Sequence, residues 1–128
     1  MGEERRWRPR VLVVEDNPLL ARFTAIQLTQ LGCDVVGPAG SVRDAVELAG
    51  GEPLDAALLD VNIAELSAAP IADVLRHRGI PFAVMTGYGP ERIPPVFREE
   101  LCLYKPFRES DLKSLMAILI GDHAEGSS

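Results

Sequence analysis

The stretch Val11-Leu-Val-Val-Glu-Asp-Asn-Pro18 decides the fold, because it joins an apolar run to an acidic pair and then to a helix start. Four consecutive aliphatic residues are typical of a strand buried on both faces, as in a parallel sheet. Asn17 can cap a helix whose first position is Pro18, where a missing N–H has no cost. The stretch therefore predicts a strand followed at once by a helix, with Glu15 and Asp16 at the carboxyl end of the strand.

Strand-like and helix-like segments alternate along the rest of the chain. Apolar runs predict further strands at 34–36, 56–59, 82–85 and 101–104, the first of these being weak. The last helix has the clearest pattern, since its apolar residues recur at offsets of three, four, seven and eight. These residues are Leu112, Leu115, Met116, Leu119 and Ile120. This alternation is typical of βαβ units.

Glycine, proline and capping residues predict where the helices begin and end. Gly32 is expected to end the first helix, and Ser41 with Asp44 resembles a capping box that starts the second. Gly50 and Gly51 are expected to end that second helix. A third helix is expected to begin near Pro70 and to stop before Gly79.

The predicted fold is α/β, with a doubly wound, five-stranded parallel sheet of flavodoxin-like strand order 2-1-3-4-5 and right-handed crossovers. The fourth crossover is the irregular one. Adjacent Pro94 and Pro95 remove two backbone donors and clash within a continuous helix. We therefore expect a short or distorted fourth helix.

Composition indicates one soluble globular domain. The 128 residues are 47% hydrophobic and carry a net charge of −6, which favours cation or protein partners over nucleic acid. We expect the domain to span 10–121, between flexible tails at 1–9 and 122–128. No apolar stretch has the length of a membrane span or a signal peptide, so we expect no membrane insertion and a cytoplasmic protein. Cys33 and Cys102 are expected to be reduced, space-filling thiols.

Polar side chains follow four of the predicted strands, where the carboxyl ends of parallel strands meet at one edge of the sheet. They are Glu15, Asp16, Asp60, Thr86 and Lys105. Two like charges about 4 Å apart repel by roughly 4 kcal/mol at an effective dielectric constant of about 20, so one lysine cannot neutralise three carboxylates. Hard oxygen ligands suit Mg²⁺, which is the cofactor that this pattern predicts.

This set of side chains is suited to phosphoryl transfer, which needs a nucleophile, a metal ion and donors for the phosphoryl oxygens. Asp60 stands alone at a strand end and is the expected phosphoacceptor. Glu15 and Asp16 are expected to hold the cation together with Asp60, with Glu15 acting through a water molecule or only as added charge. Thr86 and Lys105 would each stabilise a phosphoryl oxygen.

Across positions 10 to 121 these residues resemble the receiver domains of two-component response regulators. The matching motif is an acidic pair after strand one, an Asp ending strand three, a Thr after strand four and Lys105-Pro106 after strand five. The resemblance implies that Asn62 supplies a backbone carbonyl to the metal, unless it only shapes the loop. It also implies a cis peptide before Pro106, which an X-Pro bond adopts at low cost.

A narrower resemblance is to bacterial single-domain receivers with an F-A-T-G-hydrophobic-Y signature after strand four. The corresponding residues here are Phe82-Ala-Val-Met-Thr-Gly-Tyr-Gly89. This resemblance implies that such proteins are partners of histidine kinases of alphaproteobacteria.

The resemblance implies a single-domain response regulator. A histidine kinase would phosphorylate Asp60 with Mg²⁺, and the phosphorylated form would bind a downstream target protein differently. The only catalysis expected is the protein's own phosphorylation and dephosphorylation.

The alternative is a phosphate sink or phosphorelay intermediate that exchanges phosphoryl groups with a phosphotransfer protein and has no target of its own. A receiver that does not take phosphate is disfavoured by the complete set of site residues. An aspartyl-phosphate phosphatase is disfavoured because Asn62, which cannot act as a general acid, stands two residues after Asp60.

One position departs from the receiver pattern. Typical receivers carry an aromatic residue three positions before the lysine, where this chain has Cys102. A thiol cannot fill the same space, so the coupling from the site to the surface must differ. We hypothesise that Tyr88 replaces that aromatic as a switch, against the alternative that it only packs.

Overall fold

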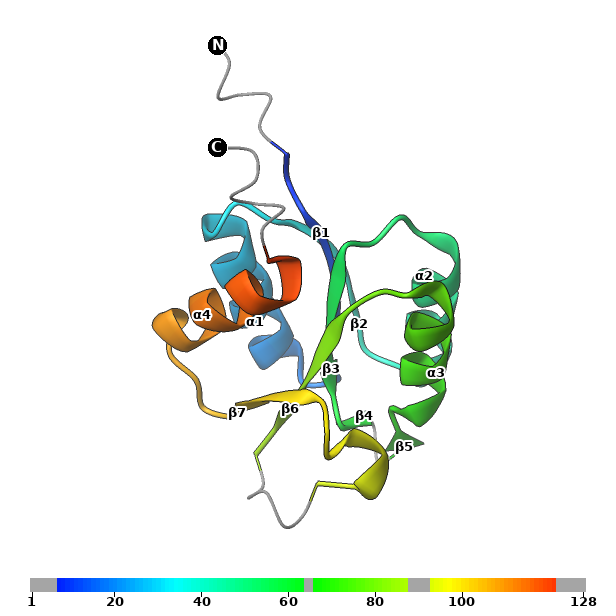
Figure 1. Ribbon diagram of the computed structural model, residues 1–128. Helices are drawn as coiled ribbons and strands as arrows, with labels where there is room; N and C mark the ends of the chain where they lie inside the picture. The colour runs from blue at the N-terminus through cyan, green and yellow to red at the C-terminus, as the bar shows by residue number, and fades with distance from the viewer. Residues whose placement is uncertain (1–6, 64–65, 88–92, 122–128) are drawn as a thin grey trace.

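The computed structural model describes residues 7–63, 66–87 and 93–121, which form a parallel sheet covered by helices on both faces (Figure 1). The sheet strands are β1 (Arg10–Val14), β2 (Asp34–Ala39), β3 (Ala56–Asp60), β6 (Phe82–Thr86) and β7 (Leu101–Tyr104). Their order is β2-β1-β3-β6-β7. Without the two short strands β4 and β5, which lie outside this sheet, the order is 2-1-3-4-5. The predicted flavodoxin-like, doubly wound fold is therefore confirmed.

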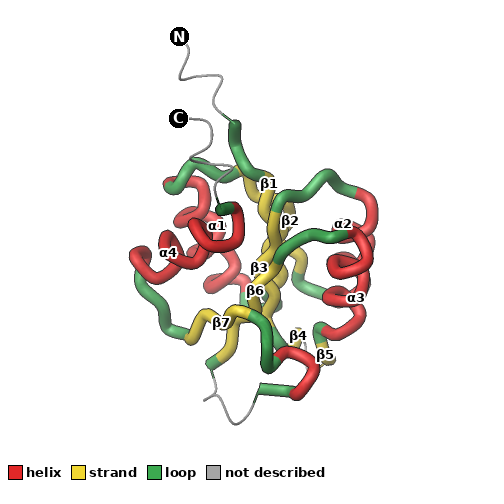
Figure 2. Tube along the Cα trace, in the orientation of Figure 1, coloured by secondary structure: helices red, strands yellow, loops and turns green. Residues whose placement is uncertain are grey.

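The helices lie in two pairs on opposite faces of the sheet (Figure 2). They are α1 (Pro18–Gln30), α2 (Val42–Gly51), α3 (Ala69–Arg78) and α4 (Glu109–Ile120). Helices α1 and α4 cover one face, and α2 and α3 cover the other. Side chains of the central strands alternate between two cores, so that Leu12 and Leu59 face α2 and α3, whereas Val13 and Leu58 face α1 and α4. Both faces of the sheet are buried, which explains the nearly continuous apolar runs of β1 and β3.

Two of the predicted helix starts, those of α1 and α2, have side-chain caps. The Asn17 side chain accepts hydrogen bonds from the backbone N–H groups of Leu19 and Leu20. Ser41 accepts one from the N–H of Asp44. These caps satisfy donors that the first helical turn leaves without partners.

Helix α2 ends at Gly51, as predicted, and the Glu52 N–H bonded to the Leu48 carbonyl caps it. A β carbon on Gly50 would come 3.9 Å from Val74 Cγ1. Packing of α2 against α3 thus outweighs the cost of about 1 kcal/mol per helical glycine.

Strand β2 extends three residues beyond its prediction, through a kink at Gly37 and Pro38. Gly37 has φ +92°, and a β carbon there would lie 2.7 Å from the Ala39 nitrogen, so the backbone requires glycine. The β1–β2 register shifts at this kink. Beyond it, the Glu15 N–H donates to the Ala39 carbonyl at 2.9 Å. The end of β2 therefore supports the turn that carries the acidic pair.

Two small elements complete the fold. Strands β4 (Asn62–Ile63) and β5 (Leu66–Ser67) form an antiparallel pair just after Asp60, which the sequence did not predict. Between β6 and β7, the described residues contain a single 3₁₀ turn, η3 (Pro95–Phe97). The expectation of a short fourth helix is confirmed, and Pro94 and Pro95 are the physical reason.

Among the helices of the described residues, none combines the length and the apolar character that a membrane span needs.

Candidate functional site

The sheet brings the predicted site residues to its carboxyl edge. Asp60 is the last residue of β3 and Thr86 is the last of β6, while Glu15 follows β1 and Lys105 follows β7. Parallel pairing keeps these ends level, since Asp60 lies opposite Met85 and Thr86 lies opposite Tyr104. Residues up to 90 positions apart thus meet at one edge.

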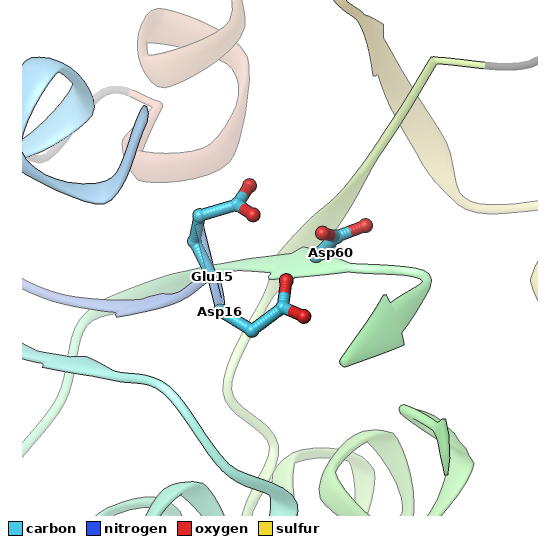
Figure 3. Close-up of side chains that lie close together, drawn as sticks. All are labelled: Glu15, Asp16 and Asp60. Carbon is cyan, nitrogen blue, oxygen red and sulfur yellow. The ribbon is translucent and has the colours of Figure 1, made fainter. Parts of the chain in front are cut away.

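The three carboxylates gather at the ends of β1 and β3 (Figure 3). Glu15, Asp16 and Asp60 each offer an oxygen, and these atoms lie within 4.8 Å of one another. Glu15 and Asp60 are only 3% and 8% exposed, whereas Asp16 is exposed. Three hard oxygen donors with excess negative charge fit a divalent cation such as Mg²⁺ better than a soft metal.

Lys105 lies between two of these carboxylates. Its Nζ atom is 2.7 Å from Glu15 Oε1 and 3.1 Å from Asp60 Oδ2. The Lys105 side chain is 18% exposed, so both ion pairs are partly shielded from water. Its backbone N–H donates to the Thr86 carbonyl at 2.8 Å, and its peptide bond to Pro106 is cis, as the resemblance implies.

Burial and pairing shift the pKa values of this ion pair. Burial raises the pKa of Glu15, and hydrogen bonds from Lys105 and the Asn17 N–H offset this only in part. For Lys105, burial acts to lower the pKa, but the hydrogen bonds and charges of Glu15 and Asp60 outweigh it, so its pKa is raised. Glu15 and Asp60 therefore favour the charged ammonium form of Lys105.

Thr86 and Asn62 flank the acceptor. Thr86 is 1% exposed at the end of β6, beside the end of β3. The Asn62 backbone N–H points at Asp60 Oδ1 from 3.4 Å, and Asn62 is paired with Ser67 across β4 and β5. The short β4–β5 pair thus holds the loop that follows the acceptor.

The two proposed switch positions differ in what the structure shows. Tyr88 lies outside the described residues. Cys102 is a free, partly buried thiol on β7, opposite Val84, and burial raises its pKa. The core cluster against which Cys102 packs contains Phe97, which is 1% exposed. An aromatic ring is therefore supplied to this core by η3, a contribution that sequence reasoning missed.

Sequence reasoning also missed an apolar surface on α1, beside the site. Three of its large side chains are well exposed, with Leu19 at 79%, Phe23 at 47% and Ile26 at 48%. Together with Asn17, Leu20 and Arg22 they line an open groove. The available signal was that Leu19, Phe23 and Ile26 follow a helical spacing on the side opposite the buried Ala21, Thr24 and Leu28.

A doubly wound sheet with an acidic pair, a buried aspartate and a lysine at its carboxyl edge defines the receiver class of signalling domains. A family model for the response regulator receiver domain matches residues 11–117. The chain belongs to this family of receiver domains of two-component signalling.

Similar proteins come from several bacteria. The transcriptional regulatory protein PdtaR of Mycobacterium tuberculosis is 32% identical over 107 residues, which are 80% of this chain and 52% of PdtaR. The chain thus spans about half the length of this curated relative. The solution structure of SdrG from Sphingomonas melonis Fr1 superposes with a TM-score of 0.79 at 32% identity, covering 88% of this chain and 97% of SdrG.

A third structure shares the fold at lower identity. The receiver domain of the sensor histidine kinase PA1611 from Pseudomonas aeruginosa PAO1 has a TM-score of 0.78 at 24% identity, over 90% of this chain and 99% of that domain. That structure holds a magnesium ion coordinated in its active site cleft.

Proposed function

We propose that this protein is a response regulator whose Asp60 accepts a phosphoryl group from a histidine kinase with Mg²⁺, and whose phosphorylation changes its binding to a target protein. One observation carries the proposal: a nearly buried aspartate at the end of β3 lies 3.1 Å from a lysine and within 4.8 Å of two further carboxylates. A purely structural role gives no reason to concentrate so much negative charge at one edge.

The transfer is a substitution at phosphorus. An oxygen of Asp60 attacks the phosphorus of the phosphohistidine, forming a P–O bond while the P–N bond breaks. The electron pair of that bond returns to the imidazole nitrogen, which then takes up a proton. Lys105 is placed to stabilise a phosphoryl oxygen, and Thr86 stands at the neighbouring strand end with a hydroxyl group. The protein catalyses nothing beyond its own phosphorylation and dephosphorylation.

The donor set supports a magnesium site. Asp16 and Asp60 would hold the ion, with the Asn62 carbonyl as a further ligand. When bound, Mg²⁺ neutralises charge that builds up between the carboxylates and the incoming phosphoryl oxygens. The magnesium bound in the PA1611 receiver domain agrees with this assignment.

The α1 surface supports a protein donor. Leu19 directly follows the Asn17-Pro18 turn, so the exposed apolar groove begins next to the acidic pair. A kinase that carries its phosphohistidine on a helix could pack that helix along α1 and present the phosphoryl group to Asp60. Exposed apolar residues gathered on one face are typical of a protein interface.

Phosphorylation of the metal-loaded protein is the direct test. We expect incubation with Mg²⁺ and a small phosphoryl donor, or with beryllofluoride, to modify the wild type, as seen by intact mass or by ¹⁹F NMR. The Asp60→Asn variant should show neither signal. A wild type that gains no phosphoryl group and binds no beryllofluoride would contradict the proposal. Rapid loss of the phosphoryl group without phosphorylation-dependent binding of any target would favour the phosphate sink instead.

The docking surface has a separate test. Phe23→Asp should slow phosphotransfer from the cognate kinase by tenfold or more, since it places a charge in the apolar contact. Phosphorylation by a small donor should not change. Ile118→Asp is the matched control, because Ile118 is also exposed, at 63%, but lies on α4. Equal slowing by both substitutions would argue against docking on α1.

A further inference from the structure

Two polar side chains are buried on the inner face of α1. Thr24 is completely buried and Gln27 is only 7% exposed, and the apolar Ala21 and Leu28 are buried on the same helix. Leu28 belongs to the core that this helix shares with the sheet and α4. A hydroxyl and an amide at this place lose the water that solvates them in the unfolded chain. Each of them therefore needs a hydrogen-bond partner in the folded protein.

Within the part of the chain that the structure describes, no group bonds to the Thr24 hydroxyl oxygen or to the Gln27 carbonyl oxygen, although both atoms are shielded from solvent. Thr29 shows the usual solution for a threonine in a helix, since its Oγ1 donates to the Ala25 carbonyl at 2.9 Å. Thr24 does not make the corresponding bond to the Leu20 carbonyl. Native proteins leave few buried polar atoms without a partner, because each one costs free energy. A partner from outside these protein groups is therefore expected.

Spacing and chemistry indicate one small partner for both oxygens. Side chains three residues apart on a helix are neighbours, with their β carbons about 5–6 Å apart. A molecule about 2.8 Å from each oxygen can bridge a gap of up to about 5.6 Å. The Gln27 carbonyl oxygen can only accept, so the partner must donate to it, whereas the Thr24 hydroxyl can accept or donate. Two neutral oxygens are too few ligands for a metal ion, but they suit a water molecule, which has two donors and fits a closed interior.

We propose that one internal water molecule bridges Thr24 Oγ1 and Gln27 Oε1, so that α1 packs on the rest of the protein through a hydrated contact. The outer face of the same helix carries the exposed apolar groove. The proposed docking surface thus belongs to a helix whose inner face is partly polar. The bridge needs neither Mg²⁺ nor a phosphoryl group, so it can be tested on the protein alone.

Urea unfolding of variants with similar side-chain shapes tests the bridge. Thr24→Val and Gln27→Met each remove one polar group and leave the other group and the water short of a hydrogen bond. Each should raise the unfolding equilibrium constant roughly tenfold. The double variant removes both groups, so its constant should also lie roughly tenfold above the wild type, and not a hundredfold. If the two groups instead have no partner at all, each single substitution removes an unsatisfied buried atom and the constant should fall. A constant that falls or stays unchanged in both single variants would overturn the proposal.

A second cycle separates hydrogen bonding from packing. Thr24→Ser keeps the hydroxyl, so adding Gln27→Met to it should still raise the unfolding constant roughly tenfold. Adding Gln27→Met to Thr24→Val should have little effect, because the bridge is already lost. Thr29→Val is the control, since Thr29 is exposed on the same helix, and it should leave the effect of Gln27→Met unchanged. Equal effects of Gln27→Met in the serine and valine backgrounds would show that the two groups are not coupled, against the proposal.

A high-resolution crystal structure of the wild type gives a readout that does not depend on how the variants fold. Electron density for a water oxygen is expected within about 3.2 Å of both Thr24 Oγ1 and Gln27 Oε1. A Thr24 hydroxyl that bonds instead to the Leu20 carbonyl, or an absence of density between the two side chains, would overturn the proposal.

Discussion

At the scale of single residues, the site is a balance between burial and pairing. Burying a charge is costly unless the group is paired and hydrogen-bonded. Glu15 and Lys105 meet this condition through each other, and Asp60 through Lys105. Three carboxylates offer oxygens within 4.8 Å of one another, and this concentration of negative charge makes the site receptive to a divalent cation.

The raised pKa of Glu15 predicts a pH-dependent stability for the metal-free protein. A carboxyl group whose pKa is higher in the folded state than its ordinary value of 4.5 binds its proton more tightly when folded. The contribution of Glu15 to stability is therefore present below pH 4.5 and falls as pH rises through the folded-state pKa. Urea unfolding of the wild type and of Glu15→Gln across this range should show the wild type losing stability relative to the variant as pH rises. A difference between the two proteins that is independent of pH would refute this linkage.

At the scale of secondary-structure elements, the unusual part is the connection between β6 and β7. The 3₁₀ turn η3 stands where a helix would cover the edge strand. Arg76 of α3 ties this segment down, since its Nη2 donates to the Val96 carbonyl at 3.1 Å and to Glu100 at 2.9 Å. The same guanidinium lies over the Phe82 ring, 5.3 Å from its centroid. One side chain thus fixes a segment too short to be stable alone.

Removing Arg76 should loosen the η3 segment. We expect Arg76→Met to raise amide hydrogen exchange at Phe97 and Glu100 by roughly tenfold and to lower the unfolding free energy by about 1 kcal/mol. The matched control is Arg78→Met, because Arg78 lies on the same helix but donates to the Ala49 and Glu52 carbonyls at the end of α2. If amide exchange at Phe97 and Glu100 rises equally in both variants, Arg76 does not specifically stabilise η3.

At the scale of the whole molecule, the sheet concentrates distant charges and the two cores keep them in place. Five parallel strands bring their carboxyl ends together, and helices bury both faces behind that edge (Figure 1). The rigid interior holds the acidic residues close despite their repulsion. Folding and metal binding should therefore be linked, because a ligand that binds only the folded state stabilises it.

Magnesium should stabilise the folded protein measurably. At about one hundred times its dissociation constant, Mg²⁺ should add about 2.7 kcal/mol to the unfolding free energy, and a chelator should reverse the effect. Thermal unfolding with and without Mg²⁺ measures this. Asp16→Asn should lose most of the stabilisation, whereas Glu47→Gln, which alters an exposed carboxylate on α2, should keep it. Equal stabilisation of both variants would indicate non-specific binding.

The sequence by itself determined the strands of the parallel sheet and the residues that stand at the site edge. Buried parallel strands have a strong local signal in runs such as Val11–Val14, and the residue that ends each run must lie at the sheet's rim whatever the details of packing. The same reasoning predicted the disrupted fourth helix, because the effect of Pro94 and Pro95 on the backbone is local.

Only the tertiary structure decided the features that depend on neighbours from other elements. Strand β2 continues past Gly37 and Pro38 because Val14 of β1 pairs with Ala39 and the Glu15 N–H donates to the Ala39 carbonyl. The different surroundings of Glu15 and Asp16 belong here too. These residues are adjacent in sequence and chemically alike, but Glu15 is buried against Lys105, 90 positions away, whereas Asp16 is exposed. Which carboxylate is buried against the lysine and which faces solvent is set by the crossing of distant strands, and no local pattern encodes it.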